Sequence, residues 1–159
     1  MVRNSKKYTV LIIDDDEINR QMADTILTRK LPYEILLAQS GMQGVEMLHQ
    51  HDVNLILLDV TMPVWDGFKT LSVIRKDEKL RHIPVILLTA SADRTTVVKA
   101  SEHGVVDYIK KPFLPDDLVS RVAKAIWENW EQSGIEALQQ DIASLLKDVG
   151  IRDRRNDVY

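Results

Sequence analysis

One aspartate, Asp59, ends a continuous apolar run in the stretch LLDVTMPVWDG, residues 57–67. A carboxylate at the end of a buried strand is costly unless it pairs with a cation, binds a metal or reacts. The residues that follow the other apolar runs are also polar, and they are Asp14, Asp15 and Asp16, Thr89, and Lys110 with Lys111. The sequence therefore places several side chains that could take part in chemistry at the ends of its apolar runs.

The elements that must position these residues alternate along the chain. Short apolar runs predict strands at residues 8–13, 34–38, 53–58, 85–89 and 105–109, and helical periodicity fills the stretches after them. Because parallel strands need crossover connections, which are usually helices, this order predicts a parallel α/β sheet covered on both faces. Reactive groups in such a sheet collect beyond the carboxyl ends of the strands.

If the first and third strands are neighbours, Asp14, Asp15 and Asp59 converge on one small site. Three carboxylates at close range raise one another's pKa unless a cation lies among them, and Mg²⁺ is the natural occupant of an oxygen-rich site. Thr89 adds a hydroxyl donor, and a lysine after the fifth strand adds a positive charge. Together these groups predict phosphoryl transfer with Asp59 as the nucleophile.

Four segments resemble the motifs of the receiver domains of two-component response regulators. They are VLIIDDDEINR, LILLDVTMPVWDG, VILLTA and DYIKKPF. The resemblance implies a flavodoxin-like fold, a doubly wound five-stranded parallel sheet of order 2-1-3-4-5. It also implies that a phosphohistidine of a sensor histidine kinase, or of a histidine phosphotransfer protein, phosphorylates Asp59. Such a module catalyses only its own phosphorylation and dephosphorylation, so the chain is not expected to be an enzyme.

The resemblance further implies a metal site and two positions that set the rate of dephosphorylation. Asp14, Asp15 and Asp59, with the backbone carbonyl of Thr61, would hold Mg²⁺, or Mn²⁺ in its place. The side chains of Thr61 and Ser91 occupy the positions that orient an attacking water in the family. Neither is an acid or an amide, so the sequence predicts slow loss of the phosphoryl group.

Three more residues match the family's conformational switch. Thr89 matches the switch hydroxyl, Lys111 the phosphoryl-binding lysine, and Tyr108 the aromatic side chain that turns inward after phosphorylation. Lys110 is the bystander of the lysine pair, because neighbouring strand residues point to opposite faces. The family pattern also implies a cis peptide bond before Pro112. Phosphorylation would then reshape the surface of the fourth helix, fifth strand and fifth helix for a downstream protein or a second copy.

Composition limits the other functions that the chain can have. The formal net charge of the 159 residues is -3, which argues against direct binding of nucleic acid or of an anionic membrane. The sequence has no cysteine, which excludes thiolate chemistry and fits a reducing cytoplasm. No apolar run approaches the length of a membrane span. A cytoplasmic localisation is therefore expected.

The last part of the sequence predicts an extra C-terminal helix. Residues 1–130 would form the receiver domain, and residues 131–159 would form an amphipathic helix with a charged tail. Ser133 with Glu136 reads as a capping box that starts this helix, and Gly150 as its stop. Its apolar residues, spaced as in a coiled coil, are Ile135, Leu138, Ile142, Leu145 and Val149. Two heptads are marginal alone, so the helix should fold back onto Trp127 and Trp130 or pair with another chain.

The sequence leaves three alternatives open. A haloacid-dehalogenase-like phosphatase also uses an aspartate nucleophile, Mg²⁺, a threonine or serine, and a lysine, but it requires a second aspartate where this chain has Thr61. The chain is either a stand-alone receiver or the N-terminal piece of a longer regulator with an output domain. Asp107 and Arg121 either pair within the chain or across a dimer.

Overall fold

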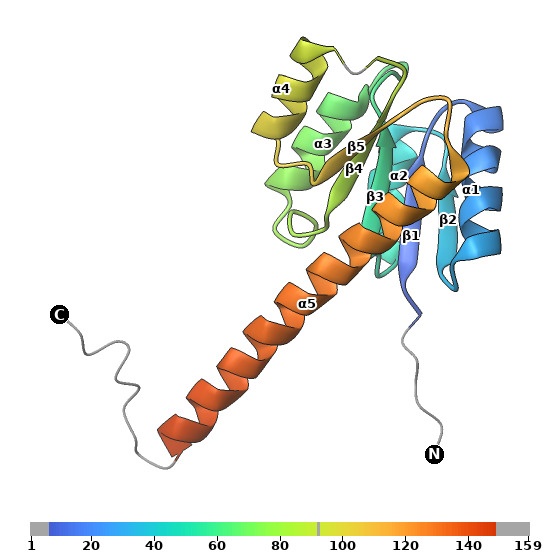
Figure 1. Cartoon of the computed structure of the whole chain (residues 1–159). Helices are drawn as coiled ribbons and strands as arrows, with labels where there is room; N and C mark the ends of the chain where they lie inside the picture. Colours follow the sequence, from blue (N-terminus) through green and yellow to red (C-terminus); the bar gives the residue numbers. More distant parts are fainter. Residues whose placement is uncertain (1–6, 92, 149–159) are drawn as a thin grey trace. The chain divides into compact units, whose positions relative to one another are not determined.

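The computed structural model describes residues 7–91 and 93–148 (Figure 1). Strands and helices alternate throughout this part of the chain. The strands are β1 (Thr9–Ile13), β2 (Glu34–Ala38), β3 (Leu55–Asp59), β4 (Val85–Thr89) and β5 (Asp107–Lys110). The helices are α1 (Glu17–Lys30), α2 (Gly41–Gln50), α3 (Gly67–Lys76), α4 (Arg94–Glu102) and α5 (Pro115–Asp148).

The strands form one parallel sheet in the order β2-β1-β3-β4-β5. This confirms the predicted flavodoxin-like topology, and the strands lie where the apolar runs predict them. β1 and β3 are neighbours, and their register pairs Ile13 with Leu58. The residues that follow this pair, Asp14 and Asp59, therefore leave the sheet side by side.

Helices cover both faces of the sheet, because successive strand residues point to opposite sides. Leu11, Ile13, Ile56 and Leu58 pack with apolar residues of α2, α3 and α4 on one face. The other face is covered by α1 and the first part of α5 (Figure 1), and its buried residues include Val10, Ile12, Leu55, Leu57, Leu118 and Val122. With apolar side chains buried on both faces, the central strands fix the positions of the residues at their ends.

Side-chain caps start the helices at the carboxyl edge of the sheet. The Asp16 carboxylate accepts a hydrogen bond from the Asn19 N–H at the start of α1, and Asp66 and Asp93 cap α3 and α4 in the same way. Each cap satisfies backbone donors that the first turn of a helix leaves free. The loops that carry the reactive residues thus end in fixed helix starts.

The prediction that a separate helix begins at Ser133 is wrong. α5 continues without a break from Pro115 to Asp148. No proline interrupts this stretch after its first residue, and the cost of Gly134, about 1 kcal/mol relative to alanine, does not stop a helix formed by the residues around it. Folding back onto Trp127 and Trp130 is excluded, since both lie on the same helix as residues 135–148. Val149, Gly150 and the charged tail lie outside the described residues.

The chain divides into two compact units, one ending at Ile126 and the other beginning at Trp127. The sheet and its helices make up the first unit, and the later turns of α5 belong to the second. Within residues 7–91 and 93–148, no helix is both long enough and apolar enough to cross a bilayer.

Candidate functional site

The carboxyl edge of β1 and β3 carries a cluster of three carboxylates. Asp14, Asp15 and Asp59 each offer an oxygen, and these oxygens lie within 4.8 Å of one another. Asp14 is fully buried and Asp59 is 5% exposed, whereas Asp15 faces solvent. The convergence predicted from the order of the strands is therefore present.

Lys111 brings a positive charge to this cluster. Its Nζ lies 2.8 Å from Oδ2 of Asp14 and 3.2 Å from Oδ1 of Asp59. Lys110, its neighbour in sequence, is exposed. The peptide bond between Lys111 and Pro112 is cis, as the family pattern implies. Burial lowers the pKa of Lys111, but the hydrogen bond to Asp14 and the charge of Asp59 outweigh it, so its pKa is raised overall.

The carboxyl group of Asp59 resists ionisation. Burial and the negative charge of Asp14 raise its pKa from 3.8 to about 6, against the opposite effect of Lys111 and of the Thr61 backbone N–H. Asp59 is therefore held in a buried position, where Lys111 offsets its negative charge only in part. A further cation beside it would favour the ionised, nucleophilic form.

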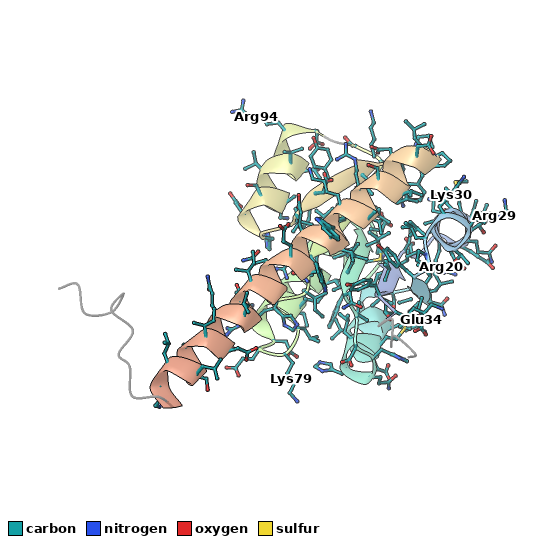
Figure 2. The ribbon with its side chains drawn as sticks, turned by 60° about the horizontal axis from the view of Figure 1, so that its bottom comes forward. Arg20, Arg29, Lys30, Glu34, Lys79 and Arg94 are labelled. Atoms are coloured by element: carbon teal, nitrogen blue, oxygen red, sulfur yellow. The ribbon has the colours of Figure 1, made fainter. Side chains whose placement is uncertain are left out.

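The buried Asp14 is fixed from two sides. Its Oδ1 accepts a hydrogen bond of 2.9 Å from the Asp16 N–H, and its backbone carbonyl accepts one of 2.7 Å from Nη1 of Arg20. Figure 2 shows Arg20 on the side of α1 that faces the sheet and Arg29 on the opposite side. We did not identify Arg20 as a site residue from sequence, since its partner is a main-chain atom. The sequence feature that could have pointed to Arg20 is its position, a basic residue four residues after the acidic run that ends at Asp16.

The loop from β3 to α3 brings the backbone close to Asp59. A Cβ atom on Gly67 would lie 2.4 Å from the Asp59 carbonyl oxygen and 2.8 Å from Cα of Val60. Glycine is therefore required at this close approach of two backbone segments. Val64, in the same loop, has φ of 66° and is 91% exposed. The Thr61 amide points at the Asp59 carboxylate, as the pKa of Asp59 reflects.

The predicted switch residues lie on the neighbouring strands β4 and β5, with Thr89 at the end of β4 and Tyr108 paired with Leu87. Thr89 is buried, and its hydroxyl donates to the Ser91 carbonyl at 2.6 Å and accepts from the Ser91 N–H at 3.1 Å. Tyr108 is 41% exposed, so its ring is not enclosed by the core. The hydroxyl of Thr89 is thus held by its own loop, and the bond that it donates to Ser91 must break before it can donate to another acceptor.

Arg121 on α5 makes its ion pairs within the chain. Nη1 of Arg121 donates to both carboxylate oxygens of Asp107, at 2.7 and 2.8 Å, and Nε donates to Asp117 at 2.8 Å. These hydrogen bonds raise the pKa of Arg121 above its already high value. Of the two pairings that the sequence leaves open for Asp107 and Arg121, the structure contains the one within the chain.

Comparison with known proteins identifies the architecture. The family model described as the response regulator receiver domain matches residues 10–123. The chain belongs to this family. The match includes all the acidic residues of the cluster together with Thr89 and Lys111, so the receiver reading holds and the phosphatase alternative does not.

Individual relatives agree with this assignment. Chemotaxis protein CheY-3 of Vibrio cholerae is 34% identical over 121 residues, which are 76% of this chain and 92% of that protein. The probable transcriptional regulator ycf27 of Galdieria sulphuraria is 38% identical over 117 residues, 74% of this chain. This chain spans only 44% of the length of that regulator. Among solved structures, the CheY-like receiver domain protein from Methanospirillum hungatei has a TM-score of 0.73 at 25% identity, covering 80% of this chain and 99% of that one.

Proposed function

We propose that Asp59 of this receiver domain accepts a phosphoryl group from a phosphohistidine on a sensor histidine kinase or a histidine phosphotransfer protein. The observation that carries the proposal is the contact of the Asp59 carboxylate with Lys111 at 3.2 Å inside the cluster with Asp14 and Asp15. An oxygen of Asp59 attacks phosphorus while the bond from phosphorus to the donor nitrogen breaks. The electron pair of that bond stays on the imidazole.

The donor set suits a hard divalent cation. The three clustered carboxylates offer only oxygen atoms, and exposed Asp15 leaves one side of the cluster open to water. Asp14, Asp15, Asp59 and the Thr61 carbonyl would hold Mg²⁺ or Mn²⁺. Such an ion, when bound, neutralises charge on the phosphoryl oxygens. Lys111, which contacts Asp14, would help to neutralise the same oxygens, and Arg20 holds the main chain of Asp14 through its carbonyl.

Phosphorylation by a small donor tests this proposal. Intact mass after incubation with acetyl phosphate and Mg²⁺ should show one added phosphoryl group in the wild type and none in Asp59→Asn. Asp66→Asn is the matched control, because asparagine also caps a helix. A modified Asp59→Asn variant, or a wild type that stays unmodified while binding Mg²⁺, would contradict the proposal.

Thr89 and Tyr108 provide a route from the phosphoryl group to a partner. We propose that the Thr89 hydroxyl turns from Ser91 to the phosphoryl oxygens and that Tyr108 moves inward into the space left behind. The surface of α4, β5 and α5 then changes shape for a downstream protein. Moving such a balance from about 1:99 to 99:1 needs a differential of roughly 5.5 kcal/mol.

The phosphoryl group should be lost slowly. Thr61 and Ser91 are both exposed, and neither offers a carboxylate or an amide to orient water. We propose that dephosphorylation takes minutes or longer, which loss of radiolabel in Mg²⁺ would measure. A half-life of seconds would rule this out.

The chain as a whole is proposed to be a regulatory module of the cytoplasm rather than an enzyme, with residues 1–130 as receiver and residues 131–159 as an accessory segment. Sustained multiple turnover of a generic phosphate ester would contradict the regulatory assignment. An output domain in a longer regulator is compatible with it, because relatives such as ycf27 are longer than this chain.

A further inference from the structure

The later turns of α5 expose a row of large apolar side chains. Trp127, Leu138 and Leu145 are each at least 60% exposed, and Trp130, Ile135 and Ile142 are also exposed. We call these six residues the α5 stripe. In proteins, most of the stability of a helix comes from the packing of its apolar face rather than from the intrinsic propensity of its residues. The stripe therefore needs a partner if these turns are to be stable.

The stripe is not an extension of the face with which α5 covers the sheet. Within the first unit, the buried residues of α5 are Leu118, Val122, Ala125 and Ile126. At 3.6 residues per turn, the residues of the α5 stripe do not continue the helical spacing of that buried face. Most residues that continue that spacing beyond Ile126 are polar, with Ala143 as the exception: Asn129, Gln132, Glu136, Gln140 and Lys147. The apolar side changes along the helix.

The residue types within the stripe select the partner. Ile135 and Ile142 lie seven residues apart, as do Leu138 and Leu145, which gives the a and d positions of two heptads. Among parallel coiled coils, β-branched isoleucine at a with leucine at d favours two strands over three or four. We propose that four residues of the α5 stripe, Ile135, Leu138, Ile142 and Leu145, pair with the same residues of a second copy of this chain, in parallel and in register.

The charges beside this seam allow the parallel pairing. Between residues 132 and 146, the e positions are Gln132, Gln139 and Leu146. The g positions are Gly134 and Asp141. In a parallel pair, Asp141 lies opposite Leu146 of the second copy, so no like charges meet there. All the residues of the stripe lie in the second unit, whereas Asp59 lies in the first.

Single cysteines test the orientation, and the chain has no cysteine of its own to interfere. Identical d residues face each other only in a parallel, in-register pair. Full-length Leu145→Cys should therefore form a disulfide-linked dimer under mild oxidation. Gln140→Cys, at an outward f position, should not. Cross-linking of Leu145→Cys with Ile135→Cys, but not with itself, would mean antiparallel helices and overturn the proposal.

Mass in solution tests the interface itself. By light scattering at high micromolar concentration, the wild type should be a dimer and the variant Leu138→Glu with Leu145→Glu a monomer. The control Gln140→Glu with Lys147→Glu adds the same two acidic side chains on the opposite face and should stay a dimer. A monomeric wild type, or a dimer that survives the first double change, would overturn the proposal.

Discussion

The ionised form of Asp59 is unfavourable in the folded protein, since burial and the charge of Asp14 raise its pKa to about 6. A carboxyl group with a folded-state pKa above its unfolded value binds its proton more tightly when folded. Its ionisation therefore destabilises the fold, and this penalty grows as pH rises from about 4 to about 6 and is complete above that range. The same unfavourable charge makes Asp59 ready to bind a cation or to react.

Asp59→Asn should accordingly stabilise the protein in the absence of divalent ions. We expect a gain of about 1 to 3 kcal/mol in the free energy of unfolding at about pH 7.5 and little gain at about pH 4. Urea denaturation in a chelator at both pH values measures the difference from the wild type. Asp66→Asn controls for loss of a surface carboxylate. An equal gain at both pH values would mean that the charge of Asp59 is not the cause.

Gly67→Ala should damage the same site through the backbone. The added Cβ meets main-chain atoms of Asp59 and Val60, which cannot move as a flexible side chain can. We expect the free energy of unfolding to fall by about 1 to 3 kcal/mol, together with slower phosphorylation by acetyl phosphate. Gly134→Ala is the matched control, because nothing lies within 4 Å of its Cβ position. Unchanged stability in Gly67→Ala would show that the loop adapts.

At the scale of elements, Ser91 reports on the connection between β4 and α4. Its N–H donates to the Thr89 hydroxyl, and that bond must break if Thr89 turns to a phosphoryl group. Adding beryllofluoride and Mg²⁺, which mimic phosphorylation, should speed exchange of the Ser91 amide proton. In Thr89→Ala, exchange should already be fast and should not respond. NMR measures the exchange rate of the Ser91 amide proton in the wild type and in Thr89→Ala. A wild-type Ser91 amide that stays protected after beryllofluoride is added would contradict the proposed turn of Thr89.

The sequence predicts elements well where apolar periodicity carries the information. The positions of the strands follow from it, whereas their order was implied by the resemblance to receiver domains. Hydrogen bonds from side chains to backbone carbonyls cannot be predicted from apolar periodicity. Arg20 donates to a carbonyl of Asp14, and Arg75 donates to carbonyls of Ile83 and His103. The prediction of a separate helix from Ser133 was wrong because a capping-box sequence starts a helix only where the preceding residues are not helical. Here the turns before Ser133 already belong to α5.

For the whole molecule, the two units should lose structure separately. If the second unit is a coiled coil, its melting temperature depends on protein concentration, whereas that of the first unit does not. Far-ultraviolet circular dichroism should show an early helical phase that moves to higher temperature as concentration rises. Leu138→Glu with Leu145→Glu should abolish this phase and leave the main transition in place. One transition that does not depend on concentration would contradict separate units.

The contact of Lys111 with both Asp14 and Asp59 gives the resting site one positive charge against three carboxylates. Under the proposed function, a divalent cation would bring these charges into balance, and a phosphoryl group on Asp59 would make the site negative again. Ion and phosphoryl group therefore strengthen each other's binding, and by linkage they do so equally. On this proposal, the site would respond strongly only when the ion and the phosphoryl group are both present.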